Sequence, residues 1–539
     1  MTRTTASLHR LSAALAPPRA LPSGAPRVQT NSGVVQGLTL PSGVRAFRGI
    51  PFAAPPVRDR RWTPPQPALP WPGVRLADRF AHQSMQARVF GDMMFRNAGM
   101  SEDCLYLNVW APATAAPGAN LPVLVYIYGG GFVAGDGSEP RYDGERMASR
   151  GMVVVTFTYR LGVFGFLAHP ELAAESPHHA SGNYGHLDQV AALAWVRDNI
   201  EQFGGHPAEV TVAGESAGSY SVNALMASPL SRGLFARAIG ESGAYFGASR
   251  SVSTHDDAQR HGQAFATRVG AASLADLRAR SATELLEASG QPGAAPFLAN
   301  IDGWFLPARP ADLFAAGQQA QVPLLAGWNS EELGWRALLP DDPAPETARA
   351  VLAQRFGARA AQAERLYPVS TADEARQSLT DVASDHFMGY PTWKWMEEHQ
   401  RTSGQPVYRY FYTRPRPAPV EAGVTANLAG GVTRTSDAPR DPPATGAVHS
   451  AEIEYALGNL SLNPVFGWTP DDHTVSQTMQ GYFANFIKAG DPNGDGLPHW
   501  PASQHRADRP ALRMRIDVVS RTEPEPRARY VFLDQTDPR

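Results

Sequence analysis

Short apolar runs, each bounded by Gly, Pro or Asn, recur along this chain of 539 residues. They read LPVLVYIY (121–128), MVVVTFTY (152–159), EVTVAG (209–214), RAIGES (237–242) and VPLLAGW (322–328). Such runs are typical of strands that are buried on both faces of a parallel sheet. Between them lie helical patterns, most clearly in 186–203, where one face carries Leu187, Val190, Ala191, Ala194 and Trp195. The alternation predicts an α/β fold, with a central, mostly parallel twisted sheet flanked by helices.

The rest of the chain suggests one large domain. We interpret 27–539 as a single domain whose helical insertions, at about 250–320 and 340–400, lie over the sheet. Residues 1–26 are expected to be a disordered tail. The stretch 414–446 is rich in Pro and Gly, which predicts a long loop of either functional or disordered character.

Two capping boxes predict where helices of these insertions begin. Ser281 is followed three residues later by Glu284, and Thr371 by Glu374, each ahead of apolar positions. In a capping box the hydroxyl and the carboxylate each accept a hydrogen bond from a free backbone N–H of the first turn.

Charge and apolar patterning exclude several classes of partner. The net charge is −3, lysine occurs only at 394 and 488, and the arginines are scattered among more numerous acidic residues. This balance argues against a nucleic-acid or anionic-membrane partner. The longest apolar stretch, 152–167, is interrupted by Arg160 and is shorter than the roughly 20 residues of a spanning helix. We therefore expect no membrane span.

Cysteine usage bears on the compartment. Cys104 is the only cysteine, so no intrachain disulfide is possible. The apolar part of the N-terminal segment, LSAALA, is shorter than the roughly 7 residues of a signal sequence. These features favour a cytoplasmic protein, with secretion left open, and the sequence does not indicate an oligomeric state.

The pentapeptide GESAG directly follows the predicted strand 209–214. Its glycines, Gly214 and Gly218, allow a sharp strand-to-helix turn that exposes the hydroxyl of Ser216. A serine hydroxyl becomes a nucleophile only when a base accepts its proton, so a histidine and an orienting carboxylate are required. From these residues alone, a glycine-rich turn with an idle serine stays an equal alternative.

A second glycine cluster, Gly129 to Gly131, follows the predicted strand 121–128. Backbone N–H groups there can approach a ligand and stabilise negative charge on a carbonyl oxygen. A simple β-turn is the alternative for this cluster when it is taken alone. A dinucleotide-binding loop fits poorly, because Ala134 occupies the place of the last glycine in G-x-G-x-x-G.

Taken together, the motifs resemble the type-B carboxylesterase (cholinesterase-like) family of α/β-hydrolases. The resemblance spans about residues 30–505 and rests on FRGIPFAAPP, SEDCLYLNVW, YGGGF, YRLGVFGFL, GNYGHLDQVAALAWVRDNIEQFGG, VTVAGESAGS, GWNSEE, GAVHSAEIEYALGNL and FIKAGDPNGDGLPHWP. It implies the α/β-hydrolase fold and a carboxylic ester hydrolase that works through an acyl-enzyme, on small to medium acyl or aryl esters and with no cofactor.

The resemblance also implies site residues. Ser216 matches the nucleophile, His449 the general base and Glu332 the acid of the triad. The neighbouring Glu331 remains a rival to Glu332, because Leu333 replaces the glycine that the family usually has there. The resemblance further implies oxyanion-hole N–H groups and supporting acidic or hydroxyl groups, namely Gly130, Gly131 and Ala217 for the hole and Glu215 and Ser242 for the support.

Several positions depart from the family or match only its structural features. The segment before Cys104 lacks a tryptophan and a second cysteine, so a choline site is not indicated. His186 stands where the family more often has an apolar residue, and we interpret it as a satisfied residue at a helix start. The family pattern predicts two structural ion pairs, Arg48 with Glu102 and Arg160 with Asp188.

No metal site is expected. The segment DPNGDG, 491–496, matches the first half of a calcium loop, but Ala502 stands where the bidentate glutamate is required, so we interpret it as a turn. Two other functions stay open from the sequence. One is an amide or carbamate hydrolase with the same triad, and the other is a non-catalytic cholinesterase-like adhesion module.

Overall fold

The central feature of the computed structural model is an eleven-stranded sheet. The structure describes residues 24–90, 93–247, 251–421, 423–426, 432–434, 445–503 and 511–536. In spatial order the strands are β18 (Arg521–Pro524), β17 (Leu512–Ile516), β14 (Val407–Tyr412), β13 (Leu324–Asn329), β10 (Arg237–Glu241), β9 (Gly205–Glu215), β7 (Leu121–Ile127), β8 (Val153–Phe157), β6 (Tyr106–Ala111), β4 (Arg45–Pro51) and β3 (Leu38–Thr39).

The middle of this sheet is parallel and its margins are antiparallel. The strands from β17 through β14, β13, β10, β9 and β7 to β8 pair in parallel. The pairs at the two ends are antiparallel. At one end β17 pairs with β18, and at the other β8 pairs with β6, β6 with β4, and β4 with β3. The five apolar runs correspond to β7, β8, β9, β10 and β13, so the predicted α/β fold class is confirmed.

Smaller strands lie outside the main sheet. They are β1 (Arg27–Thr30), β2 (Gly33–Gln36) and β5 (Val74–Leu76) in one sheet, β11 (Ser253–Thr254) with β12 (Asn300–Ile301), and β15 (Val424–Ala426) with β16 (Val432–Arg434). The last pair lies within the predicted loop 414–446. The rest of that loop between 427 and 444, like the expected tail up to residue 23, lies outside the described residues.

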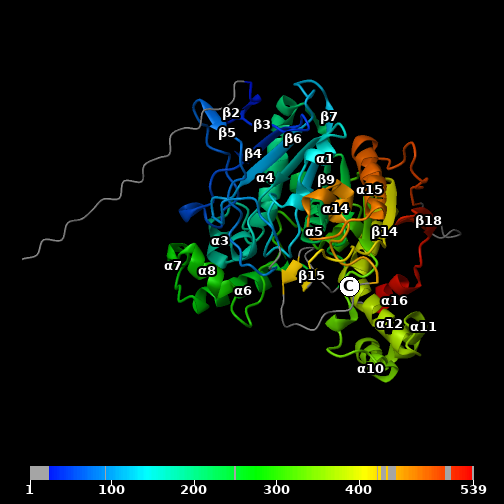
Figure 1. The fold of residues 1–539 in the computed structure, drawn as a ribbon. Coiled ribbons are helices and arrows are strands. Elements are labelled where there is room, and N and C mark those ends of the chain that lie inside the picture. The colour runs from blue at the N-terminus through cyan, green and yellow to red at the C-terminus, as the bar shows by residue number, and fades with distance from the viewer. Residues whose placement is uncertain are drawn as a thin grey trace, which may run out of the picture.

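The helices cover both faces of the sheet and one end of the molecule. They are α1 (Glu145–Ala148), α2 (Gly162–Phe166), α3 (Pro170–Glu175), α4 (Tyr184–Asn199), α5 (Ala217–Ala227), α6 (His255–Arg268), α7 (Leu274–Ala279), α8 (Ala282–Ser289), α9 (Pro310–Ala315), α10 (Pro345–Phe356), α11 (Ala360–Leu366), α12 (Ala372–Ser384), α13 (Tyr390–Ser403), α14 (Ile453–Leu457), α15 (Pro470–Ala489) and α16 (Ala528–Thr536). In Figure 1, α6 to α8 and α10 to α12 form two groups at the lower end, one on each side of β15.

The predicted face of α4 is only partly right. Leu187 and Trp195 are buried, but Val190, Ala191 and Ala194 are only partly buried. The more deeply buried side carries Gln189, Ala192, Leu193 and Val196. Because this helix packs between the sheet and other helices, polar as well as apolar positions lie in the interior.

One of the two predicted capping boxes is complete. At the start of α8, Glu284 N–H donates to the Ser281 hydroxyl and Ser281 N–H donates to the Glu284 carboxylate, at 3.2 and 2.8 Å. At the start of α12 the Thr371 hydroxyl accepts from Glu374 N–H at 3.2 Å. The Glu374 carboxylate, however, accepts from the N–H of Ser370, so this second box is not reciprocal.

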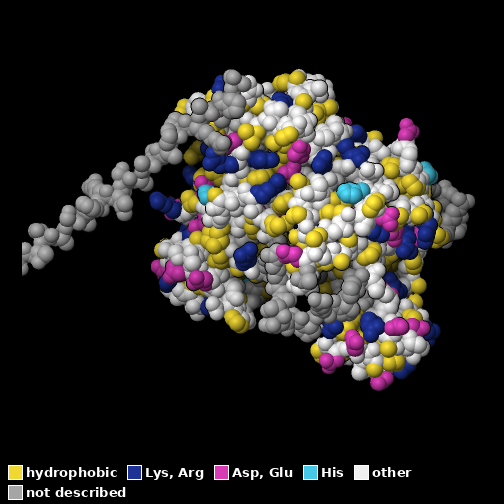
Figure 2. Space-filling model, in the orientation of Figure 1, with side chains coloured by type: hydrophobic (Ala, Val, Ile, Leu, Met, Phe, Trp, Pro, Cys, Tyr) yellow, Lys and Arg dark blue, Asp and Glu magenta, His cyan; other side chains and the backbone are white. Residues whose placement is uncertain are grey.

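The surface carries both signs of charge. Figure 2 shows basic and acidic side chains interspersed over the visible face. None of the helices in the described part of the chain combines the length and the apolar character that crossing a bilayer requires.

Candidate active site

Ser216 lies on the turn from β9 to α5. Its backbone has φ 54° and ψ −121°, a conformation that residues with a side chain seldom adopt. A side chain at Gly218 would collide with the carbonyl oxygen of Ile127, and one at Gly214 would lie 2.6 Å from the backbone of Gly218. The two glycines therefore let α5 start close against the end of β7, and the strained serine stands at the carboxyl end of the sheet.

His449 and Glu332 reach this serine from two distant segments. The Nε2 atom of His449 lies 2.9 Å from the Ser216 hydroxyl, and its Nδ1 atom lies 2.6 Å from Oε2 of Glu332. All three side chains are in the interior or at its edge, with His449 3% and Glu332 0% exposed. The structure thus brings together a hydroxyl, an imidazole and a carboxylate in one hydrogen-bonded line.

The carboxylate of Glu332 is held in place by two further donors. The Ser242 hydroxyl donates to its Oε1 atom, and the N–H of Asn329 donates to the same oxygen at 2.6 Å. The side-chain amide of Asn329 also donates to the carbonyl of Val448, next to His449, at 2.9 Å. Asn329 therefore ties the end of β13 to the histidine loop.

The rival acid Glu331 points to a different partner. Its carboxylate accepts a hydrogen bond from the Thr445 hydroxyl, and its N–H donates to the carbonyl of Ala447 at 2.8 Å. In this structure Glu331 braces the loop before His449, and Glu332 is the glutamate that contacts the imidazole on Nδ1.

The glycine turn lies beside the serine. A side chain at Gly129 would lie 3.1 Å from Cβ of Ser216. Gly130 and Gly131 have φ values of 111° and 66°, a region that favours glycine. Ala217 directly follows Ser216 as the first residue of α5. The three residues predicted for the oxyanion hole therefore lie in segments that adjoin the serine.

Glu215 approaches the same imidazole nitrogen as the serine does. Its Oε1 atom lies 3.2 Å from Nε2 of His449 and accepts a hydrogen bond from the Ser450 hydroxyl at 2.6 Å. Burial alone would lower the pKa of His449, but the charges of Glu215 and Glu332 and the hydrogen bond to Glu332 outweigh it, so the pKa lies above its ordinary value. Burial likewise raises the pKa of Glu215, in spite of His449 and Ser450.

Two more carboxylic acids lie beneath the site, and sequence reasoning missed both. Glu241 pairs with Glu215 across neighbouring strands and accepts a hydrogen bond from the Tyr126 hydroxyl at 3.0 Å. Burial, reinforced by the charge of Glu215, raises the pKa of Glu241 to about 8. Glu452 is equally buried and accepts from the Asn329 amide, and its pKa is also raised by burial and by nearby acids. The available signal for Glu241 was its place in a second GES motif, residues 240–242, at the end of a predicted strand.

An aromatic ring covers the histidine. Phe387 contacts His449 edge to face, with ring centroids 5.2 Å apart. It lies on a π-helical turn, Asp385–Gly389, between α12 and α13. Single π-helical turns are uncommon and often occur at functional sites. Sequence reasoning missed this residue, since nothing in the local pattern marks a change of helical pitch.

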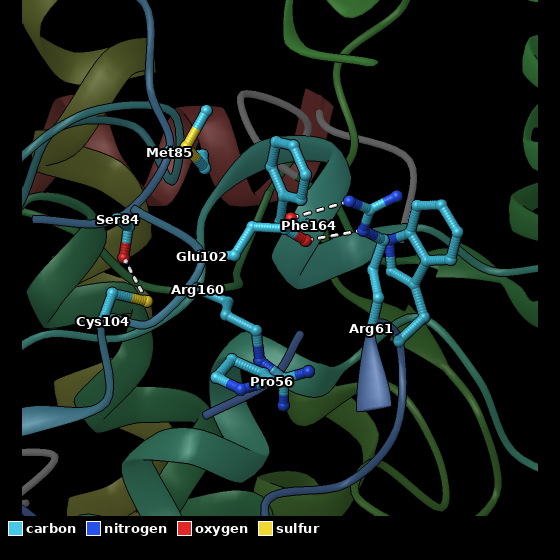
Figure 3. Close-up of a pocket in the computed structure, with 9 residues that line it drawn as sticks. Pro56, Arg61, Ser84, Met85, Glu102, Cys104, Arg160 and Phe164 are labelled. Atoms are coloured by element: carbon cyan, nitrogen blue, oxygen red, sulfur yellow. Dashed lines mark hydrogen bonds and ion pairs between the residues drawn. The ribbon is translucent and has the colours of Figure 1, made fainter. Parts of the chain in front are cut away.

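A separate cavity lies around Cys104 and contains about 250 Å³ of empty space, open solvent included. Figure 3 shows Arg61 and Glu102 facing each other at its edge, where Arg61 Nη2 donates to the carboxylate at 2.6 Å. The predicted pair of Arg48 with Glu102 is therefore wrong. The guanidinium of Arg48 instead lies over the ring of Phe80, 4.8 Å from its centre.

Two other structural predictions, the ion pair of Arg160 with Asp188 and the turn at 491–496, agree with the structure. Arg160 and Asp188 form the expected ion pair, with 2.7 Å between Nη2 and Oδ1. Burial raises the pKa of the Cys104 thiol to about 12, so this cysteine is a protonated core residue. The segment 491–496 is a turn in which the Asp491 carboxylate accepts from Asn493 N–H at 2.9 Å. Within the described residues, no group of three or more His, Cys, Asp or Glu is arranged to hold a metal ion.

Comparison with known proteins gives one family. The model of the carboxylesterase family matches residues 24–530. The chain is 35% identical over 500 residues to fumonisin B1 esterase of Sphingopyxis macrogoltabida, covering 89% of this chain and 85% of that one. It is also 35% identical over 522 residues to carboxylesterase 1C of Rattus norvegicus, covering 89% and 88%.

Solved structures agree. A PNB esterase superposes with a TM-score of 0.77 at 32% identity, covering 95% of this chain and 99% of the other. A carboxylesterase of Geobacillus stearothermophilus superposes with a TM-score of 0.76 at 29% identity, covering 94% and 99%. The likeness therefore extends over nearly the whole described fold.

Proposed function

Because the chain belongs to the carboxylesterase family of α/β-hydrolases, and is thus a carboxylic ester hydrolase, we propose that Ser216, His449 and Glu332 are its catalytic triad. One observation carries the proposal: a single imidazole is hydrogen-bonded to the Ser216 hydroxyl at 2.9 Å and to the Glu332 carboxylate at 2.6 Å. Nδ1 donates to Glu332, which leaves Nε2 as the acceptor for the serine proton.

In the acylation step, the Ser216 oxygen attacks the ester carbonyl and its proton passes to Nε2 of His449. The N–H groups of Gly130, Gly131 and Ala217 bind the negative oxygen of the tetrahedral intermediate. As the carbon–oxygen bond to the alcohol breaks, the imidazolium returns the proton to the leaving alkoxide. The products of this step are a free alcohol and an acyl-Ser216 ester.

In the second step, water attacks the acyl-serine and gives its proton to His449. Collapse of the second intermediate breaks the acyl–Ser216 bond, and the proton returns to the serine oxygen as the acid departs. Glu332 orients the imidazole throughout, while Glu215, 3.2 Å from Nε2, stabilises the imidazolium. The cycle restores the free enzyme and uses only water, so it requires no cofactor.

We further propose small to medium acyl or aryl esters as substrates. Support comes from relatives named as carboxylesterases and from the apolar ring of Phe387 over His449. The same triad is able to cleave amides and carbamates, and among the described residues no feature of the site favours them over esters. A chain-length series of p-nitrophenyl esters, compared with the matched p-nitroanilides, measures both preferences.

The central test is Ser216→Ala. We expect kcat on p-nitrophenyl butyrate to fall by about 10⁴-fold or more, because the nucleophile is removed. A fluorophosphonate should label the wild-type chain at Ser216 and leave the variant unlabelled. The matched control is Ser219→Ala, since this buried serine donates instead to the carbonyl of Gly243. Esterase activity that survives Ser216→Ala would refute the assignment.

A further inference from the structure

His186 is buried in the first turn of α4, against the glycine turn of the active site. Its side chain is fully buried. The imidazole stacks on Phe305, with ring centroids 5.0 Å apart and planes 14° apart. It meets Phe132 and Phe166 edge to face at 5.4 and 5.3 Å. A polar ring thus occupies a box made of three phenylalanines.

The contact with Phe132 connects His186 to the glycine turn. Phe132 directly follows Gly131 and has φ 63°, an unfavourable backbone conformation for an aromatic residue. Such a conformation persists only where the surroundings hold it. Here the carbonyl of Phe132 accepts from Gly162 N–H at 2.7 Å, and its ring is packed between those of Phe166 and His186.

A chain of hydrogen bonds connects the other side of His186 to the helix that follows the nucleophile. Nδ1 of His186 lies 3.0 Å from Oε1 of Gln189. The Gln189 amide nitrogen lies 2.9 Å from the Ser221 hydroxyl, and that hydroxyl lies 2.8 Å from the carbonyl of Ala217. This series of hydrogen bonds therefore ends on Ala217, the residue next to Ser216.

The Ala217 carbonyl, the last group in this series of hydrogen bonds, fixes which group donates in each of them. The Ala217 carbonyl can only accept, so the Ser221 hydroxyl donates to it and accepts from the Gln189 amide. The Gln189 oxygen must then accept from Nδ1–H of His186. In a neutral imidazole, Nε2 then carries no hydrogen and can only accept. Among the described residues that Nε2 has no hydrogen-bond partner. Burial lowers the pKa of His186 to about 4, so the ring is neutral at neutral pH.

We propose that His186 is a positioning residue that holds the glycine turn and the first turn of α5 in fixed register. The inference rests on the proposed function, in which Gly130, Gly131 and Ala217 supply the oxyanion donors from these two segments. The ring sets the position of Phe132, and Nδ1–H sets Ala217 through Gln189 and Ser221. An apolar residue would fill the box but would leave the Gln189 oxygen unpaired and the two segments uncoupled.

The first test is His186→Leu, assayed with p-nitrophenyl butyrate and with an aryl trifluoromethyl ketone, which forms a tetrahedral adduct with serine. A small misplacement of oxyanion donors weakens the transition state more than the ground state, so we expect kcat to fall on the order of 10- to 100-fold. KM should stay within about twofold, and affinity for the ketone should fall in parallel with kcat. Unchanged kcat and ketone affinity would overturn the proposal.

Two further variants separate positioning from folding. His186→Asn keeps an N–H donor near the place of Nδ1 and should recover part of the lost kcat. His186→Leu with Gln189→Leu removes both polar partners, so stability should recover while kcat stays low. If the double variant regains both stability and wild-type kcat, His186 has no positioning role. If His186→Leu does not fold, Ser221→Ala and His186→Asn test the same chain by the same split of kcat from KM.

The matched control is His399→Gln. His399, on α13, is also fully buried and neutral, with a pKa lowered to about 4 by burial, but its Nε2 atom bonds the carbonyl of Val322, just before β13. This variant should leave kcat and ketone affinity unchanged. An equal loss in both histidine variants would assign the effect to general destabilisation and overturn the proposal. Failure of the triad itself is distinguishable, since it would appear as activity in Ser216→Ala.

Discussion

Two glutamates contact one imidazole from opposite sides, and they should have different effects on catalysis. Glu332 bonds Nδ1 of His449, whereas Glu215 lies 3.2 Å from Nε2. The first fixes the tautomer and orientation of the base. The second acts through its charge, which is among the causes that raise the pKa of His449.

Glu332→Gln should therefore lower kcat far more than the same change at its neighbour. An amide at 332 no longer secures Nδ1 as a donor, and we expect a loss of about 10⁴-fold at neutral pH. Glu331→Gln, the matched control, should stay within a few fold, because Glu331 contacts Thr445 instead of the imidazole. Steady-state kinetics on one aryl ester compares them, and a larger loss at Glu331 would reverse the assignment of the acid.

Glu215→Gln should move the acid limb of the pH profile. Catalysis needs neutral His449, so kcat/KM of the wild type should rise with pH through a midpoint above about 6.5. Removing the Glu215 charge makes the imidazolium less stable, so the midpoint should shift to lower pH. A profile of kcat/KM from pH 5 to 9 measures the shift, and a shift to higher pH would contradict this account.

At the site, the positions of the triad residues could be predicted because each stands in one motif, while their roles stay predictions. Ser216, His449 and Glu332 each stand in a contiguous block, and the structure places them in contact. Glu241 and Ser450 were not predicted, because the contacts of Glu241 depend on strand register and those of Ser450 on loop geometry. Glu241 reaches the site only because β10 lies next to β9, and no local pattern states which strands are neighbours.

At the scale of elements, the site depends on how closely α5 starts against the end of β7. Gly218→Ala should destabilise the protein by about 3 kcal/mol and abolish most activity, because the new methyl group would collide with the Ile127 carbonyl. The matched control is Gly334→Ala, where nothing lies within 4 Å and φ is not positive. Urea unfolding of both variants measures the difference, and equal stability would contradict the close approach.

Element type was easier to predict than element surroundings. The five apolar runs became strands because residues buried on both faces of a sheet leave a continuous signal in the sequence. The face of α4 was misjudged because its neighbours include other helices, so Gln189 is buried while Val190 is only partly buried. The partner of Glu102 was misjudged for a related reason: tertiary packing, not order along the chain, brings Arg61 to it.

At the scale of the whole molecule, the buried acids should make stability fall as pH rises from 6.5 to 8. The folded chain keeps a proton on Glu241, whose pKa is about 8, whereas the unfolded chain has released it. The folded state then binds more protons, so its stability decreases with pH. Glu452 and His449, whose pKa values are also raised, act in the same direction.

The ionisation of Glu241 alone should lower the free energy of unfolding by about 2 kcal/mol between pH 6.5 and pH 8. Glu241→Gln keeps an acceptor for the Tyr126 hydroxyl and removes the titration, so it should flatten the slope. The matched control, Glu209→Gln, removes a carboxylate that is 42% exposed and paired with Arg237, and should leave the slope unchanged. Urea unfolding at pH 6.5, 7.2 and 8 measures each slope. Buried histidines with lowered pKa values, such as His186 and His399, act in the opposite direction in both proteins, so the comparison of slopes isolates Glu241. A slope unaltered by Glu241→Gln would show that Glu241 is ionised in the folded protein.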